Sequence, residues 1–316
     1  MSISVVGIAI GAIIATKIMS LIGRKAGFIL ASIGNFSVCL LASYSILNQN
    51  FFLFCFANFV LGIGMAFTHQ YRFAAAESVE KNKIPKAISI ILLGGIVSAF
   101  LGPGIANYTK DIFSEQLYVG SYLSLGILTI IPVVFFLFYE NTSKIEASKK
   151  YSGRSRLELI SQPRFLQALV ASAFGYAIMT FLMTATPLSM HVMEKMSLSK
   201  TGMVIQFHVV AMFLPSLFTG ILIKKFGHSN MMYVGVFLYS ITILVSFFEQ
   251  TFYNYMFALI FLGLGWNFLF ISGTSLLVLT YREEEKFRAQ GLNDFIVYSV
   301  HAIGSLSAGI SIALTS

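Results

Sequence analysis

Uninterrupted apolar runs of about 20 residues recur along this chain, and they constrain its fold more than any other feature. A run of this length crosses the hydrocarbon core of a bilayer as an α-helix, whereas barrel strands are shorter and alternate between apolar and polar positions. Charged residues make up 11% of the chain and hydrophobic residues 57%, while a soluble domain has about 25% charged residues. We therefore expect an all-α polytopic membrane protein that uses the lipid bilayer as its solvent.

Ten segments are predicted to span the membrane, which places both ends of the chain on the same side. They are residues 2–21, 26–47, 52–78, 87–107, 118–139, 165–190, 201–223, 229–248, 253–280 and 288–314.

The one long hydrophilic passage, Glu140–Arg164, divides the chain. It carries six basic and three acidic residues, which is typical of a cytoplasmic connector. We therefore predict an N-terminal helical bundle over 1–139, a linker over 140–164 and a C-terminal helical bundle over 165–316.

Basic residues indicate which loops are cytoplasmic, because Lys and Arg collect on that side of a membrane. If the turn at Gly23 is cytoplasmic, sixteen basic residues fall inside and only Lys110, Lys195 and Lys200 fall outside. The sixteen are Arg24, Lys25, Lys81, Lys83, Lys86, Lys144, Lys149, Lys150, Arg154, Arg156, Arg164, Lys224, Lys225, Arg282, Lys286 and Arg288. Both ends of the chain should then face outward. The net charge of +8 is explained in this way without nucleic acid as a partner.

Two short patterns repeat along the chain. A glycine-basic turn at Gly23 returns at Gly227, an offset of 227 − 23 = 204, and a Leu-Gly pair at Gly62 returns at Gly263, an offset of 263 − 62 = 201. Each repeat skips six predicted helices, and an even number preserves orientation. The bundles should therefore be parallel, pseudo-symmetric repeats, which counts against an inverted-repeat fold.

These motifs resemble those of the major facilitator superfamily, whose loop motif reads roughly G-x-L-A-D-R-x-G-R-K. Gly23, Arg24 and Lys25 match it, while Thr16 replaces its first glycine and Ser20 its aspartate. In the second half Gly220, Leu222, Lys225 and Gly227 match, and His228 replaces the arginine. A glycine ladder ending in Gly-Pro resembles the family's antiporter motif at Gly94, Gly95, Gly102, Pro103 and Gly104. The arginine that the family's proton antiporters carry in helix 4 is Asn58 here.

The resemblance implies a secondary transporter that moves a small organic solute by alternating access, with protons as one candidate coupling ion. Longer strings (QYRFAAAE, GGIVSAFLGP, FLMTATPL and GLNDF) resemble proteobacterial facilitator permeases that we associate with riboflavin uptake. Uptake and efflux both stay open. A bacterial cytoplasmic (inner) membrane location and a monomer are expected.

On the family's helix count, the segments correspond to helices 2–11, so counterparts of helices 1 and 12 are missing. Two alternatives to transport therefore stay open: a truncated, non-functional transporter fragment, and a non-transporting membrane sensor or assembly protein.

The resemblance also implies a cytoplasmic gate. In the family, the loop arginine bonds the cytoplasmic end of helix 4, where this chain has Glu77 and Glu80. Arg24 and Lys25 could act in this way, although they could equally be topological anchors. Lys225 and His228 could act with Glu283, Glu284 and Glu285, but three successive glutamates are more typical of a solvated face.

Arg72 and Asp294 each lie about six residues inside a predicted helix, where an ionisable group is costly unless it is paired. Because the loop acid is lost at Ser20, we expect that Asp294 supplies it from the other side of the interface. Its partner would be Lys17, Arg24 or Arg72. The alternative is a snorkelling Arg72 and a water-exposed Asp294.

Polar and aromatic side chains near the predicted midplane could line a solute cavity. His301 is the candidate for proton coupling, because histidine changes charge near neutral pH. For each of these residues a role in helix packing is the alternative. The candidates are Tyr176, Thr180, Gln206, His208, Trp266, Asn267, Tyr298 and His301.

Other chemistry has little support in the sequence. There is no phosphate-binding loop and no Gly-x-Ser-x-Gly turn, and the five histidines are scattered. We expect no enzyme activity, no cofactor and no metal site. Gly94, Gly95 and Gly102 should instead let helices approach closely, and Pro103 should bend its helix.

Overall fold

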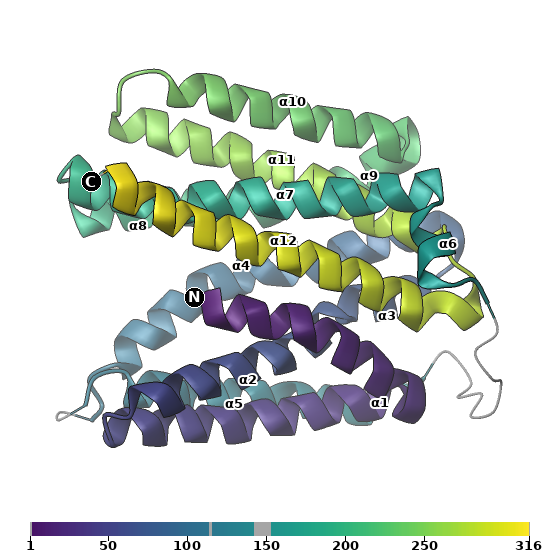
Figure 1. The fold of residues 1–316 in the computed structure, drawn as a ribbon, viewed down its shortest axis with the longest axis horizontal. Coiled ribbons are helices and arrows are strands. Elements are labelled where there is room, and N and C mark those ends of the chain that lie inside the picture. Colours follow the sequence, from purple (N-terminus) through teal and green to yellow (C-terminus); the bar gives the residue numbers. More distant parts are fainter. Residues whose placement is uncertain (1, 114–115, 142–152, 316) are drawn as a thin grey trace. The chain divides into compact units, whose positions relative to one another are not determined.

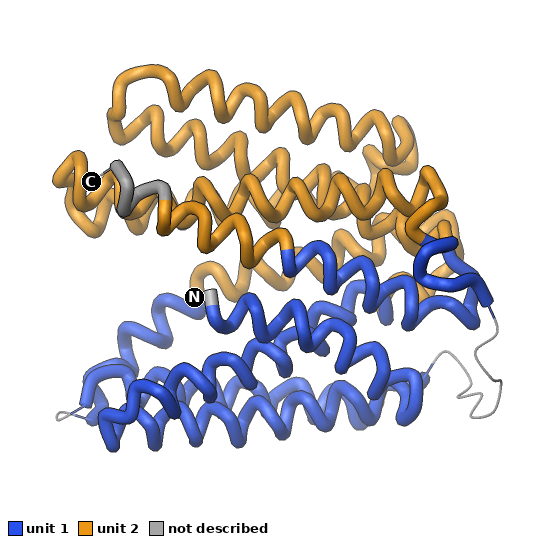
Figure 2. Tube along the Cα trace, viewed as in Figure 1, with its two compact units in different colours: residues 1–74, 101–159, 281–299 blue, residues 75–100, 160–280, 300–316 orange. Residues whose placement is uncertain are grey.

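The structure is a computed structural model that describes residues 2–113, 116–141 and 153–315. In these ranges it is all-helical, which confirms the predicted class. Most of the predicted connector, residues 142–152, lies outside the described residues. The chain divides into two compact units, which Figure 2 shows in different colours. The division into bundles 1–139 and 165–316 stays a prediction.

Seven helices of the described chain are long and apolar enough to cross a membrane, or eight if a bent pair forms one span. The predicted count of ten is therefore not confirmed. Helix α1 (Ser2–Leu47) accounts for part of the difference, because it joins the predicted segments 2–21 and 26–47 across a break at Gly23. Helix α12 (Lys286–Thr315) is not among the seven. Its first half carries Arg288, Gln290, Asn293 and Asp294, which lower its hydropathy.

Unit 1 comprises residues 1–74, 101–159 and 281–299. Its frame is α1, which packs against both α2 (Phe51–His69) and α5 (Val119–Leu137). Figure 1 shows α1 turning back on itself at its break. The unit also includes the start of α3 (Tyr71–Glu77), the end of α4 (Ile84–Thr109), nearly all of α6 (Arg156–Ile160), η3 (Glu283–Glu285) and the first half of α12.

Unit 2 comprises residues 75–100, 160–280 and 300–316. Its centre is α11 (Phe252–Val278), which packs against α7 (Pro163–Leu188), α8 (Leu198–Phe213), α9 (Ser216–Phe226) and α10 (His228–Ser246). Two short helices, η1 (Lys81–Lys83) and η2 (Ser189–Met193), also belong to it. Apolar residues surround most of α11, which is why it is buried on nearly every side.

The repeated glycines adopt the same rare backbone conformation. Gly23 has φ 82° and ψ 166°, and Gly227 has φ 85° and ψ 160°. This region is essentially restricted to glycine, because a Cβ atom would clash with the backbone. Each glycine lets one helix stop and the next begin at a sharp angle. The repeat seen in the sequence is therefore a repeat of backbone geometry as well.

The second repeated glycine has equivalent neighbours in the two units. A Cβ at Gly62 of α2 would lie 2.1 Å from the carbonyl oxygen of Ser4, and one at Gly263 of α11 would lie 2.6 Å from that of His208. Ser4 and His208 are themselves separated by 208 − 4 = 204 residues. The same helix contact is thus built twice, which supports parallel repeats.

Replacing Gly23 or Gly227 by alanine should destabilise the protein by about 1–3 kcal/mol, because alanine is strained at this φ and ψ. Thermal unfolding in detergent measures the effect as a lower midpoint. Gly34→Ala is the matched control, because Gly34 is helical and a Cβ there meets nothing within 4 Å. Equal midpoints for Gly23→Ala and Gly34→Ala would contradict this account of the turn.

Candidate functional site

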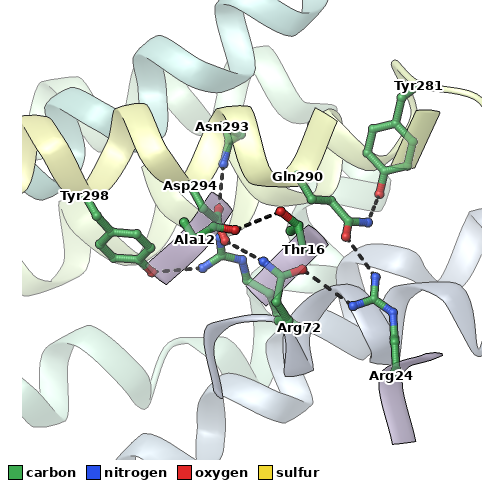
Figure 3. Close-up of polar contacts among 10 residues, drawn as sticks. Ala12, Thr16, Arg24, Arg72, Tyr281, Gln290, Asn293, Asp294 and Tyr298 are labelled. Atoms are coloured by element: carbon green, nitrogen blue, oxygen red, sulfur yellow. Dashed lines mark hydrogen bonds and ion pairs between the residues drawn. The ribbon is translucent and has the colours of Figure 1, made fainter. Parts of the chain in front are cut away.

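A buried network of charged and amide side chains lies inside unit 1 (Figure 3). Arg24 follows the break in α1, Gln70 sits at the junction of α2 and α3, and Arg72 is in the first turn of α3. The other members come from Tyr281 and from α12: Gln290, Asn293, Asp294 and Tyr298. The network therefore joins segments more than 200 residues apart.

Arg72 and Asp294 form an ion pair at the centre of this network. Their side chains are 3% and 1% exposed, so neither charge is solvated by bulk water. The carboxylate also accepts from Gln70 Nε2 and from Asn293 Nδ2, each at 2.9 Å, and Arg72 donates to the Tyr298 hydroxyl at 3.3 Å. These hydrogen bonds offset the desolvation cost that a buried ion pair carries.

Arg24 extends the network through amide oxygens. It donates to Gln290 Oε1 at 2.8 Å and to Gln70 Oε1 at 3.5 Å, and its guanidinium lies 5.0 Å from the centroid of the Phe287 ring. Gln290 in turn donates to the Tyr281 hydroxyl at 2.7 Å. Arg24 is therefore fixed by hydrogen bonds to both α12 and the α2–α3 junction.

The pairing that we expected for Asp294 is present, and its partner is Arg72. Lys17 is exposed, and the Ser20 hydroxyl donates to the Lys17 carbonyl oxygen at 2.7 Å. The first glycine of the loop motif is also absent from α1, and a glycine of α12 lies opposite its position. Thr16 occupies that position, and a Cβ at Gly291 of α12 would lie 2.4 Å from its hydroxyl oxygen. Helix α12 thus supplies both the acid and the small residue that α1 lacks.

The other first-half gate candidates lie in different places. Lys25 Nζ donates to the Leu137 carbonyl oxygen at the end of α5, at 2.7 Å. Glu80 is exposed and pairs with Lys83 at 3.2 Å. Glu77 is half-buried at the end of α3.

In the second half, a Cβ at Gly220 would lie 2.7 Å from Lys86 Cα, so α9 and the start of α4 approach closely there. Lys225 is exposed, and its ammonium lies 5.1 Å from the centroid of the Phe226 ring. Within the described part of the chain, Gly95 is the one ladder glycine at which a Cβ would meet a neighbour, the Phe213 ring. Among the described residues nothing lies within 4 Å of a Cβ at Gly94 or Gly102, so the close packing that we predicted for these two is wrong. Pro103 lies inside the continuous helix α4.

Glu285 does not belong to a solvated face, contrary to the prediction. Its side chain is fully buried and accepts from Arg154 at three donors: the backbone N at 2.8 Å, Nε at 2.9 Å and Nη2 at 2.6 Å. These hydrogen bonds lower the pKa of Glu285 to about 2. The ordinary pKa of this group is 4.5. The contact between Glu285 and Arg154 therefore stabilises the folded protein fully above a pH of 4.5, and this stabilisation is lost as the pH falls through about 2. The end of the predicted connector is thus tied to η3.

Four midplane candidates gather in unit 2. The Tyr176 ring lies 5.3 Å from Trp266 and 5.0 Å from both Phe270 and His301. Thr180 is buried one turn after Tyr176 on α7. The sequence did not single out Phe270, although it lies one helical turn after Trp266 on α11.

The remaining candidates have other surroundings. His208 and Asn267 form hydrogen bonds where α8 and α9 pack against α11. His208 Nδ1 lies 2.7 Å from the Leu259 carbonyl oxygen, and Asn267 bonds residues of α8 and α9. Gln206 is exposed. Tyr298 belongs to the Arg72 network, and its ring lies 4.6 Å from that of His69.

A family model described as Major Facilitator Superfamily matches residues 1–305. The chain belongs to the Major Facilitator Superfamily. It is 33% identical to the riboflavin transporter RfnT of Brucella anthropi over 305 residues, which are 96% of this chain and 76% of that protein. It is 27% identical to YddS, an uncharacterised MFS-type transporter of Bacillus subtilis, over 98% of this chain and 75% of that one. This MFS membrane protein is therefore related to transporters and not to enzymes.

Solved MFS structures share the fold. The transporter FucP in its outward conformation aligns with 100% of this chain and 82% of its own, with a TM-score of 0.72 at 16% identity. The human organic anion transporter MFSD10 aligns with 96% of this chain and 75% of its own, with a TM-score of 0.74 at 14% identity. At these identities the likeness shows the fold alone.

The two partners of the buried ion pair should respond differently to removal. Asp294→Asn leaves a guanidinium that cannot lose its proton, whereas Arg72→Met leaves a carboxylate that can take one up. We expect Asp294→Asn to cost about 3–5 kcal/mol and Arg72→Met to cost less at low pH. The double variant Arg72→Met/Asp294→Leu should recover much of the loss. Thermal unfolding in detergent from pH 5 to 8 measures this, and additive effects in the double variant would contradict a direct pair.

Removing the Glu285 carboxylate should release Arg154. In Glu285→Gln, cleavage by trypsin after Arg154 should become at least about tenfold faster, because three hydrogen bonds to a charged group are weakened. Mass spectrometry of the fragments measures the rate, and cleavage after the exposed Lys195 is the internal control. If both sites were cut at wild-type rates, the tie would not restrain the connector.

Proposed function

We propose that this chain is a secondary active transporter that moves a small organic solute by alternating access. In this proposal the bundles 1–139 and 165–316 rock around a site near the membrane midplane. Membership of the superfamily and the similarity to RfnT support the proposal. We place the protein in a bacterial cytoplasmic membrane, as a monomer, with residues 2 and 315 on the outer side.

The observation that carries the proposal is the buried network around Arg72 and Asp294. It connects residues from both proposed bundles through one ion pair and several hydrogen bonds. Such contacts can be broken as a set and re-formed, because water can replace each of them when the interface opens. A purely structural core would fill the same space with apolar residues at lower cost. We therefore assign the network as a gate that closes the cytoplasmic end.

For the substrate we propose a flat, riboflavin-like solute, since RfnT is named as a riboflavin transporter and aligns with nearly the whole chain. Protons are the proposed coupling ion, with His301 as the residue that would titrate. Its ring lies 5.0 Å from that of Tyr176, in the unit that also holds the candidates Thr180 and Trp266.

Counterflow tests transport without assuming a coupling ion. Proteoliposomes loaded with unlabelled riboflavin should accumulate external labelled riboflavin transiently above its equilibrium level, and vesicles without protein should not. Saturable binding without counterflow would instead favour a non-transporting sensor. If the protein showed neither counterflow nor binding, the substrate assignment would have no support. If uptake driven by a pH gradient were unchanged in His301→Ala, that residue would not be the coupling group.

A further inference from the structure

The aromatic cluster of unit 2 consists of Tyr176, Phe213, Trp266, Phe270 and His301. The centroids of the Trp266 and Phe270 rings are 4.9 Å apart, and the rings stack with an interplanar angle of 18°. The Tyr176 ring is nearly perpendicular to both, with interplanar angles of 87°. Phe213 meets Trp266 from the end of α8 at 5.8 Å. Three helices of the unit and the second half of α12 thus present their rings to one another.

Two features of the backbone fix the positions of these rings, a close helix contact and a bend. A Cβ at Gly304 would lie 2.7 Å from the Ala177 carbonyl oxygen, so α12 approaches α7 closely next to Tyr176 and His301. Between α8 and α9 the chain bends by 40° next to Phe213. Asn267 fixes this bend by donating to the Met212 carbonyl oxygen at 2.6 Å and to Ser216 Oγ at 2.8 Å, and by accepting from Thr219 at 2.6 Å. Asn267 is therefore a positioning residue rather than a ligand contact.

Trp266 carries a polar atom that this packing does not explain. Its side chain is 1% exposed, and its Nε1–H has no hydrogen-bond acceptor among the described residues. The Thr180 hydroxyl, on the helix that carries Tyr176, is also buried without such a partner. A buried donor without an acceptor is destabilising, so native proteins rarely keep one unless water or a ligand binds it.

Two residues of the cluster are also partly exposed at the surface of the unit. Phe213 and His301 are half-buried, whereas Trp266 and Phe270 between them are fully buried. A flat ring entering beside these two residues would meet aromatic faces and a free N–H group together. Aromatic faces favour offset stacking with other π-systems, and an indole N–H donates but cannot accept.

We propose that this cluster is the recognition site for the ring of a flat heteroaromatic solute. Trp266 Nε1 donates a hydrogen bond to a carbonyl oxygen or ring nitrogen of that solute. Tyr176, Phe213 and His301 supply the stacking surfaces, and Thr180 supplies a second polar contact. The inference rests on the proposed function and deepens it, because it assigns recognition to the ring and not to a polar side chain of the solute.

Trp266 is the chain's one tryptophan, so the intrinsic fluorescence of the purified protein reports on this site directly. Riboflavin and lumiflavin, which keeps the ring but lacks the ribityl chain, should both quench the emission saturably. Ribitol, which is the chain without the ring, should not. Quenching by riboflavin but not by lumiflavin would overturn ring recognition.

Variants separate the stacking surface from the donor. Tyr176→Leu should weaken lumiflavin binding roughly 3- to 10-fold through lost stacking. Trp266→Phe, measured by the fluorescence of the flavin, should weaken it roughly 2- to 10-fold because the ring remains but the N–H is lost. Tyr253→Leu is the matched control for Tyr176→Leu, because Tyr253 is an exposed tyrosine at the start of α11. The binding of a variant is compared with that of wild type only if the two proteins have similar midpoints of thermal unfolding.

The outcomes distinguish this inference from the proposed function. If riboflavin counterflow occurred but Trp266 emission stayed constant and both variants bound like wild type, the ring site would lie elsewhere and only this inference would fail. If wild-type protein neither bound nor exchanged riboflavin or lumiflavin, the proposed substrate would fail and this inference with it.

Discussion

A guanidinium and a carboxylate that are almost completely buried can persist only as a pair, and this constraint organises unit 1. Arg72 and Asp294 come from helices that are distant in the sequence, so the chain must bring α3 and α12 together before either charge is satisfied. Gln70, Asn293 and Tyr298 then complete the hydrogen bonds of the pair. Because each of these bonds can be exchanged for water, the same contact that stabilises this arrangement is suited to opening.

Close backbone contacts at glycine provide the rest of the frame. Gly23 and Gly227 turn the chain in the same way, and Gly62 and Gly263 let α2 and α11 approach their partners without a side chain between them. The units use this shared frame for different purposes. Unit 1 places charges and amides in its interior, whereas unit 2 places aromatic rings around Trp266. The roles that we propose for these two interiors are a gate for unit 1 and a solute site for unit 2.

The helical membrane fold could be predicted from the sequence, because apolar run length alone excludes most alternatives. The ion pair of Asp294 was also predictable, since a charge inside a membrane helix demands a partner. The amides were missed although Gln290, Asp294 and Tyr298 share one helix face at spacings of four residues, because uncharged polar residues give no comparable signal. Glu285 was misjudged because its partner, Arg154, lies more than 130 residues away. Asn267 resembled a cavity residue, and only the bend between α8 and α9 explains its bonds.

The proposed gate is tested most directly by the accessibility of the contact between α1 and α12. Thr16 is 4% exposed and lies against Gly291. The experiment uses a background in which the two native cysteines, Cys39 and Cys55, are replaced by serine. In that background Thr16→Cys should react slowly with N-ethylmaleimide in membrane vesicles. Adding Asp294→Asn should speed the reaction at least about tenfold, because losing the pair favours the open interface by more than about 1.4 kcal/mol. An unchanged rate would contradict the assignment of the network as a gate.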